Sequence, residues 1–295
     1  MKTKNFVLSG ILGVALAGFV LTGCHKSATT SSDTDYQAAQ DEANASFAAN
    51  DSKSVSDAAI GTATHSVSSF STYYSSTCTI TWAKDSSAAD TVTINFGNAP
   101  VQCGDLKWRQ GEIIVYWPRT AGRFWWQAYF DSANTVTQTF KGYYVGSLKS
   151  AMNGVAGTRT WTNEGHNTAG YENWNFTANL TITYPSGGGT ATWNSVRYNV
   201  LQNIGGTWYY QIKGSANGTS KNGVGYTLSI EDANPLYVTA WPWWLGGCAY
   251  IESGVIDINR TTSTNTLTIN FGTVGVCDNK AVATINGNNY PFVMW

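Results

Sequence analysis

Apolar and polar residues alternate with a period of two from about residue 64 to residue 295. In each alternating segment Val, Ile, Leu, Phe or Tyr occupies one side, and Thr, Asn or Ser occupies the other. Strands with one buried and one solvent-facing side are typical of antiparallel sheets. We therefore predict an all-β domain over residues 64–295, made of antiparallel hairpins or a meander that forms a sandwich or an open, barrel-like sheet. The alternation is clearest at 92–96, 176–184, 224–230 and 267–271.

Glycine, asparagine and proline separate these segments and predict the turns between strands. No long apolar stripe of helical period interrupts the series, which argues against a parallel β/α sheet. The predicted turns lie at 185–189, 205–206, 217–218, 222–223, 246–247 and 286–287.

Two cassettes of similar sequence lie at the ends of the predicted domain, at 78–117 and 248–295. Each has a Cys at a strand start, a strand that ends in Ile-Asn-Phe-Gly, and a second Cys with an Asp close behind it. Either the domain is duplicated about a pseudo-twofold axis, or one continuous meander has ends that resemble each other. A fainter echo between 140–160 and 193–214 favours duplication.

A helix is predicted over residues 35–62, before the first strand. Residues 34–37 match a capping box, and Tyr36, Ala39, Ala43 and Phe47 recur at helical spacing. This stripe is thin and rich in alanine, so the helix either rests on the β-domain or acts as a spacer. We favour the spacer.

The first 23 residues have the features of a signal peptide. Two lysines precede an apolar run of 15 residues, which is too short to span a membrane. The sequence Leu21-Thr-Gly-Cys24 resembles the lipobox of bacterial lipoproteins. The resemblance implies cleavage before Cys24, a lipid carrying palmitate-like acyl chains on its sulfur, and a tether over 24–34. Since His25 rather than Asp follows, it also implies the outer membrane, on either its periplasmic or its outer face. A plain secretory signal is the alternative.

Charge excludes two classes of partner. Only 12% of residues are charged, and removal of residues 1–23 takes away two lysines and no acid, which leaves a net charge of about −3. Such a chain has no basic surface for nucleic acid or for lipid headgroups. We expect contact with a membrane only through the lipid on Cys24.

Four cysteines remain beyond Cys24, and an exported protein keeps disulfides. Four cysteines allow three pairings. The repeat favours Cys78–Cys103 and Cys248–Cys277, because each pair recurs at the same place in its cassette. Zinc is the competing interpretation, but the cysteine spacing is wide and we assign no metal site.

The whole pattern resembles uncharacterised β-rich exported lipoproteins of Bacteroidota. The residues that carry this resemblance are the lipobox, the alanine-rich helix and a terminal segment, 271–287, with Phe-Gly, Cys-Asp-Asn and Asn-Gly. The resemblance implies no activity and transfers no catalytic residue.

Aromatic residues are the main compositional feature, with 13 Trp and 16 Tyr. Exposed flat rings beside polar groups can hold sugar rings, and adjacent residues of a strand face opposite sides. The candidates for a ligand platform are Trp241, Trp243, Trp244, Trp125 and Trp126. The alternative is that these rings fill the core.

Acidic residues give no recognisable catalytic motif. A glycoside hydrolase needs two facing carboxyl groups at a defined separation, and sequence does not give separations. The candidate acids are Asp105, Glu112, Glu164, Glu172, Glu231, Asp232, Glu252 and Asp278. Oxygen-rich residues near Asp278 (Asn279, Asn286, Asn288 and Asn289) suit calcium, but Asx turns explain both cassettes. We expect no cofactor and no catalytic activity, with a hydrolase as the remaining alternative.

Three functions fit the sequence. The first is a non-catalytic envelope lipoprotein that binds a glycan through exposed aromatic residues. The second is a structural or interaction subunit of an outer-membrane assembly, with its tryptophans buried or at a protein interface. The third is a carrier of an apolar ligand, which requires a deep apolar cavity.

Overall fold

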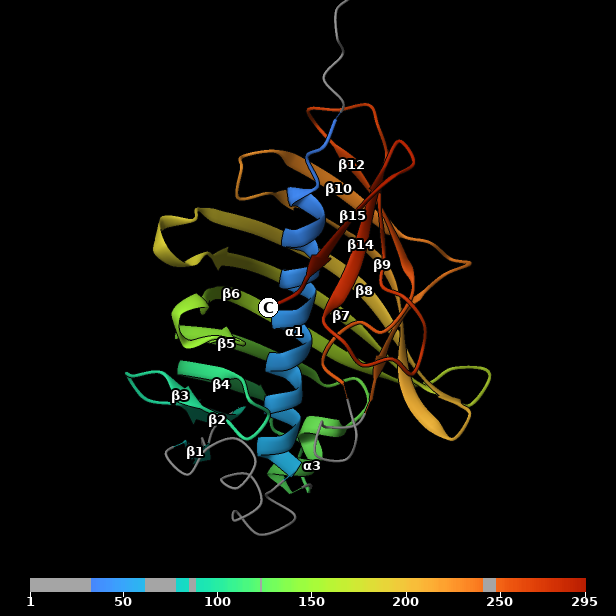
Figure 1. Ribbon diagram of the computed structural model, residues 1–295. Helices are drawn as coiled ribbons and strands as arrows, with labels where there is room; N and C mark the ends of the chain where they lie inside the picture. Colours follow the sequence, from blue (N-terminus) through green and yellow to red (C-terminus); the bar gives the residue numbers. More distant parts are fainter. Residues whose placement is uncertain (1–32, 62–77, 85–88, 123, 241–247) are drawn as a thin grey trace, which may run out of the picture. The chain divides into compact units, whose positions relative to one another are not determined.

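The computed structural model describes residues 33–61, 78–84, 89–122, 124–240 and 248–295. Asp33–Trp295 form one compact unit, in which a long helix precedes a succession of strands (Figure 1). The helices are α1 (Gln37–Gly61), α3 (Trp125–Phe130) and the single 3₁₀ turns η1 (Lys149–Ala151) and η2 (Pro185–Gly187). The strands are β1 (Thr79–Lys84), β2 (Ala89–Asn95), β3 (Val101–Gln102), β4 (Trp108–Pro118), β5 (Thr135–Gly146), β6 (Asn153–His166), β7 (Glu172–Thr183), β8 (Thr190–Ile204), β9 (Thr207–Thr219), β10 (Gly225–Ile230), β11 (Leu236–Thr239), β12 (Val255–Arg260), β13 (Leu267–Asn270), β14 (Lys280–Ile285) and β15 (Asn288–Val293).

The described strands form one continuous antiparallel sheet. Neighbours in the sheet follow the order β1-β2-β4-β5-β6-β7-β8-β9-β10-β12-β13-β14-β15, while β3 pairs with β4 and β11 pairs with β9. The sheet curves but does not close, because β1 and β15 form its two ends. The predicted all-β antiparallel class is therefore confirmed. Of the two arrangements considered, the structure has the single meander, and the favoured packing of two halves about a pseudo-twofold axis is not found.

The two cassettes lie at opposite ends of this sheet and share local geometry. Asn95 accepts a hydrogen bond from the backbone N–H of Gly97 at 2.7 Å, and Asn270 accepts one from Gly272 at 2.8 Å. Both glycines have positive φ, +87° and +99°, a conformation that disfavours other residues. The Ile-Asn-Phe-Gly sequence therefore ends a strand in the same Asx turn at both ends of the sheet.

The turn predictions are correct at four sites and wrong at one. Two-residue connections join β8 to β9 at 205–206 and β14 to β15 at 286–287, and turns also lie at 185–189 and 222–223. Asn217-Gly218 instead lies inside β9, paired with both β8 and β10. A Cβ on Gly218 would lie 2.0 Å from the carbonyl oxygen of Thr192, so this glycine permits close approach of two strands. The sixth predicted turn, 246–247, lies outside the described residues.

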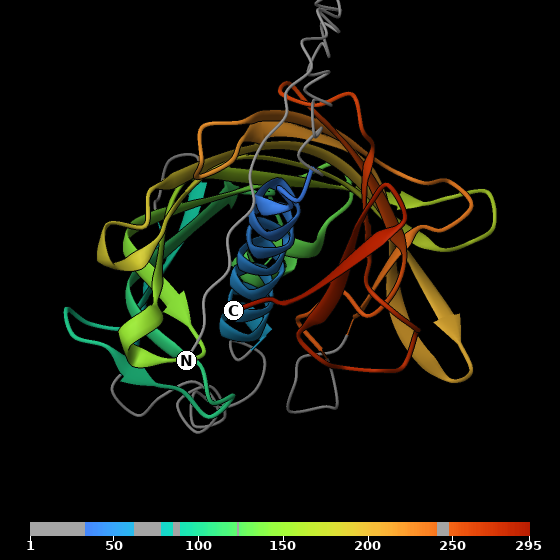
Figure 2. The same cartoon turned by 45° about the horizontal axis from the view of Figure 1, so that its top comes forward.

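Helix α1 lies on the concave side of the curved sheet (Figure 2). Of its 25 residues 18 are buried, and they include Asp41, Glu42 and Asp51 as well as alanines. The helix is therefore part of the core and does not act as the spacer that we favoured. The sequence misled because the helix has only a thin apolar stripe, while buried polar side chains such as Glu42 and Asp51 find partners on the strands.

Inward-facing polar residues of the strands supply those partners. Glu42 accepts hydrogen bonds from Trp193 Nε1 at 2.5 Å and from Arg197 Nη2 at 2.6 Å. Gln138 of β5 donates to the carbonyl oxygen of Ser52 at 3.0 Å. Buried polar groups are tolerated when they are hydrogen-bonded in this way, so these bonds fix where the helix lies on the sheet.

The start of α1 is held by carboxylates. Asp35, rather than Thr34 of the predicted capping box, accepts a hydrogen bond from the backbone N–H of Gln37 at 3.0 Å. Asp33 binds Arg260 of β12 at 2.5 Å.

No helix among the described residues is both long enough and apolar enough to cross a membrane.

Candidate functional site

A cavity of about 80 Å³ lies between the second half of α1 and the concave face of the sheet. Half-buried residues form its rim, and buried residues of the central strands form its floor. Its lining residues are Asn50, Asp51, Lys53, Ser54, Asp57, Asp105, Lys107, Arg159, Phe176, Asn199, Tyr210, Ile212, Val238, Thr239, Ala240, Cys248 and Ala249. A second cavity of about 30 Å³ adjoins it and shares Arg159, Phe176 and Asn199.

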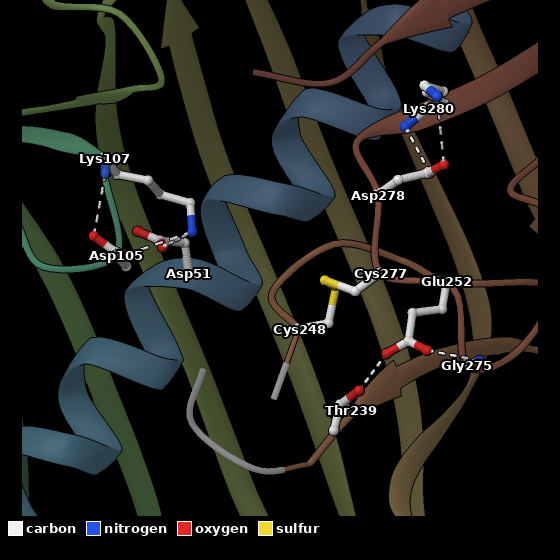
Figure 3. The surroundings of a disulfide bond; sticks show 10 residues. All are labelled: Asp51, Asp105, Lys107, Thr239, Cys248, Glu252, Gly275, Cys277, Asp278 and Lys280. Carbon is white, nitrogen blue, oxygen red and sulfur yellow. Dashed lines mark hydrogen bonds and ion pairs between the residues drawn. A yellow bond between two sulfur atoms is a disulfide. The ribbon is translucent and has the colours of Figure 1, made fainter. Parts of the chain in front are cut away.

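One wall is an ionic cluster between α1 and the strands. Arg109 of β4, fully buried, donates to Asp51 of α1 at 2.7 Å and to Asp105 at 2.7 Å and 2.8 Å. Lys107 lies 3.5 Å from both carboxylates (Figure 3). Burial acts to raise the pKa of Asp105, but the charges of Arg109 and Lys107 outweigh burial and hold that pKa at about 2.

The second cassette has the same Asp-x-Lys sequence, at Asp278 and Lys280, but this lysine does not point into the cavity. The backbone N–H of Lys107 donates to Asp105 and that of Lys280 donates to Asp278, so the local turn is shared. However, the Lys280 side chain is 73% exposed, whereas that of Lys107 is 11% exposed and points to Asp51 (Figure 3). Only the first cassette contributes this motif to the cavity.

A second ion pair lies on the rim. Lys53 binds Asp57 one helical turn later at 2.6 Å, and the hydroxyl of Tyr129 donates to Asp57 at 2.7 Å. Burial raises the pKa of Tyr129 well above its ordinary value, and the Asp57 carboxylate raises it further. Tyr129 therefore stays protonated and acts as a donor.

Arg159 of β6 is the buried cation of the floor. It is 5% exposed, and its guanidinium lies 4.8 Å from the ring centre of Phe176 and 5.7 Å from that of Trp161. It donates to the carbonyl oxygen of Ala49. Burial lowers the pKa of Arg159 to about 10, so the side chain remains charged at neutral pH.

Two neutral polar side chains complete the lining of the cavity. Asn199 of β8 is 5% exposed, and its Oδ1 has no hydrogen-bond partner among the described residues. Tyr210 of β9 is half-buried at the rim, with its ring against Trp174 at 5.4 Å. The site thus combines two aromatic rings, Phe176 and Tyr210, with groups that can donate or accept hydrogen bonds.

The state of the carboxylates bears on what the cavity can do chemically. The three carboxylates that line the cavity, Asp51, Asp57 and Asp105, are each already joined to a cation. A general acid requires a carboxyl group with a raised pKa, and the pKa of Asp105 is lowered. Nothing in this geometry indicates catalytic activity.

A comparison of the chain with protein families, with curated proteins and with solved structures found no match. No family or relative therefore points either to an enzyme or to a protein without catalytic activity.

The structure describes only part of the predicted aromatic platform. Trp241, Trp243 and Trp244 lie outside the described residues, although Ala240 and Cys248, which flank them, line the cavity. The backbone at Trp125 and Trp126 forms α3, so the argument that strand neighbours face opposite sides does not hold there. Their side chains lie outside the described part, and all five residues stay predictions.

The predicted cysteine pairs have different outcomes. Cys248 and Cys277 form a disulfide beside the cavity, as predicted (Figure 3). Cys78 and Cys103 are buried thiols in this structure. Burial, with a contribution from Cys103, raises the pKa of the Cys78 thiol to about 12. Their pairing stays a prediction, as does lipidation of Cys24, which lies outside the described residues.

The candidate acids are scattered, and only Asp105 reaches the cavity. Glu252 is buried behind the disulfide, where it accepts hydrogen bonds from Thr239 and from the backbone of Gly275 (Figure 3). Asp278 accepts from the backbone of Lys280, as an Asx turn requires. The described residues contain no group of three side chains placed to hold a metal ion.

Sequence reasoning missed most of the cavity. Asp51, Lys53, Arg159, Asn199 and Tyr210 were not candidates. The available signal was the position along the strand. Arg159 lies two residues before the buried Trp161, and Asn199 lies in the same phase of β8 as the buried Trp193, so both point inward. A charged residue on the core side of a strand indicates either a buried partner or a ligand.

A larger hollow elsewhere is a weaker candidate. It measures about 350 Å³ and is an open depression over β9, β10 and β12. Its charged member, Arg260, is already bound to Asp33. We therefore take the cavity beside α1 as the candidate site.

Proposed function

We propose that this protein is a cell-envelope lipoprotein whose β-domain binds a glycan without catalysing a reaction. The observation that carries the proposal is the half-open cavity beside α1, where Phe176 and Tyr210 lie among amide, hydroxyl and charged groups. Sugars present hydroxyl groups that both donate and accept hydrogen bonds, and apolar C–H faces that pack on rings. Ligand sites of this kind combine rings with a few converging polar groups.

Binding is favoured over hydrolysis by the state of the carboxylates. Asp105 is held ionised between Arg109 and Lys107, and Asp57 is held by Lys53 and Tyr129. Freeing Asp105 for acid–base chemistry would break a buried ion pair with Arg109, which is costly. Freeing Asp57 would break a half-buried ion pair with Lys53.

Binding of a polar ligand is also favoured over transport of an acyl chain. Helix α1 occupies the concave side of the sheet, and the space beside it is about 80 Å³ with six ionisable Lys, Arg and Asp side chains in its lining. An acyl carrier requires a deep apolar cavity, and charged groups facing an alkyl chain would be left unpaired.

The anchor is proposed from the first 24 residues alone. On this proposal Cys24 carries the lipid and residues 24–34 tether the β-domain to the outer membrane. Intact-mass measurement of protein from a bacterial membrane fraction tests it. Cys24→Ser should abolish the acyl mass and release the protein from the membrane, and an unmodified wild-type chain would contradict the anchor.

Glycan binding is tested by titrating the full-length chain in detergent with a panel of polysaccharides and then with fatty acids, followed by tryptophan fluorescence. A saturable change with one glycan class is expected. Tyr210→Ala should weaken it about 10-fold, since ring contacts contribute roughly 1–2 kcal/mol. Tyr116→Ala, at a ring 41% exposed on β4, is the matched control. A response to fatty acids alone, or none from folded protein, would overturn the proposal, and the latter would favour a structural subunit.

A further inference from the structure

The charges around the cavity do not balance. Four cations, Lys53, Lys107, Arg109 and Arg159, face three carboxylates. The neighbouring cavity adds only Arg197, which is paired with Glu42 at 2.6 Å and so contributes no net charge. Among the described residues, one positive charge is left without a matched carboxylate.

That surplus lies on Arg159. Lys107 and Arg109 share Asp51 and Asp105, and Lys53 binds Asp57. Within the described residues no carboxylate lies within 4.0 Å of Arg159, and its one hydrogen bond goes to the carbonyl oxygen of Ala49.

More distant charges do not supply the missing partner. Asp57, the carboxylate whose charge acts on Arg159, already binds Lys53 and Tyr129. The charge of Glu172 acts on Tyr210, but Glu172 itself does not line the cavity. A guanidinium that is 95% buried loses its hydration and is normally paired.

A second observation at the same floor points to a ligand. Asn199 lines both cavities, is 5% exposed, and has an unpartnered Oδ1. An amide oxygen accepts hydrogen bonds and does not donate them, so it complements a hydroxyl group. A buried cation on β6 and a buried free acceptor on β8, the two strands that flank β7, both line this space. Together they suit one ligand that presents both an anion and a hydroxyl.

We propose, on the basis of the glycan-binding function above, that the ligand is an acidic sugar whose carboxylate binds Arg159 and whose hydroxyl donates to Asn199. The guanidinium matches a carboxylate because its N–H groups form a planar fork. The stacking of Arg159 on Phe176 and Trp161 holds that fork in place before the ligand arrives, which reduces the entropy lost on binding.

The test is calorimetric titration of the full-length chain in detergent with matched pairs: glucuronate against glucose, and galacturonate against galactose. Acetate and inorganic phosphate are included as simple anions. At least one uronate should bind about 10-fold or more tightly than its neutral partner, since one charge-assisted hydrogen bond supports such a ratio.

The outcomes separate this inference from the proposed function. Uronates that bind no tighter than neutral sugars would overturn the inference and leave glycan binding intact. Binding of neither kind of sugar would overturn both. Acetate or phosphate that binds as tightly as the best uronate would show an anion site that does not recognise a sugar, and would overturn the inference.

Variants test whether Arg159 binds the carboxylate of the sugar. Arg159→Gln should lower uronate affinity at least about 10-fold and glucose affinity less than about 3-fold, because only the charge partner is lost. Lys141→Gln removes the same charge from a side chain that is 74% exposed, and should change neither affinity. Near-ultraviolet circular dichroism checks that each variant is folded.

Asn199→Asp provides a second test that does not depend on how Arg159→Gln folds. It keeps an acceptor oxygen and adds a negative charge, so uronate binding should weaken at least about 10-fold while glucose binding is retained. Equal losses for uronate and glucose would contradict the assignment of the carboxylate to this floor.

Discussion

Arg109 joins the helix to the sheet. It is fully buried and binds one carboxylate on α1, Asp51, and one beside β4, Asp105. Removing one member of such a group leaves charges buried without a partner, which is more costly than the net contribution of the group itself.

We expect Arg109→Met to lower the free energy of unfolding by about 3–5 kcal/mol. Lys141→Met removes an ion pair with Glu112 from a lysine that is 74% exposed, and should cost less than about 1 kcal/mol. Urea unfolding of both variants measures the difference. Similar small losses would mean that the buried cluster does not hold the helix.

Asp105 makes the stability of the folded protein depend on pH in the acidic range. Its pKa is about 2 in the folded protein, below the value of about 3.9 in unfolded chains. The folded state therefore binds the proton less well. The stabilisation is present above pH 4 and is lost as the pH falls toward 2, by on the order of 2–3 kcal/mol.

The Asp105→Asn variant should therefore be less stable than the wild type near neutral pH. Its free energy of unfolding should fall less than that of the wild type when the pH is lowered from 4 to 2. Part of the loss should persist in the variant, because hydrogen bonds from Arg260, opposed by a smaller effect of burial, also lower the pKa of Asp33. Unfolding free energies at pH 6, 4 and 2 measure both effects. Parallel curves for the variant and the wild type would contradict this role of Asp105.

At the level of elements, Phe47 tests whether α1 belongs to the core. The side chain is fully buried and packs on Tyr250 at 4.9 Å and on Trp295 at 5.5 Å. We expect Phe47→Ala to lower the free energy of unfolding by about 3–5 kcal/mol through lost contacts and a cavity.

The matched control is Val196→Ala, on a β8 side chain that is 63% exposed, which should cost less than about 1 kcal/mol. Thermal unfolding followed by circular dichroism compares the two variants. A melting temperature for Phe47→Ala equal to that of the wild type would restore the spacer interpretation of the helix.

Strands were predictable from the sequence and the position of the helix was not. The period-two pattern at 176–184 and 267–271 gives both the strands and their buried side, because one face of the sheet packs on a core. The helix packs through matched polar pairs such as Glu42 with Arg197, whose partners are 155 residues apart. Each half of such a pair looks solvent-exposed when it is considered alone.

The candidate site was largely hidden for the same reason. Arg159 and Asn199 meet α1 only after β6 and β8 have taken their places in the meander. Asp105 was named in advance only as one of eight candidate acids for a hydrolase, and its place beside α1 was not predicted.

At the scale of the whole molecule, the two cassettes predict which cysteines form disulfides. Cys248–Cys277 is formed and closes a loop of 29 residues, which contributes about 3–4 kcal/mol on the chain-entropy account. Since Cys78 and Cys103 occupy equivalent places, non-reducing peptide mapping of oxidised protein should find both pairs. Any link between the two cassettes, or free Cys78 and Cys103 after complete oxidation, would contradict this expectation.

The meeting of α1 with the final strands has a consequence for biogenesis. Tyr36 stacks on Tyr290 at 5.4 Å, and Phe47 contacts Trp295, so the first described segment packs against the last. During synthesis more than two hundred residues must follow α1 before its partners on the final strands have been made. Contacts so distant in sequence form late and slowly. The contacts between α1 and the final strands therefore form only after nearly the whole chain has been synthesised.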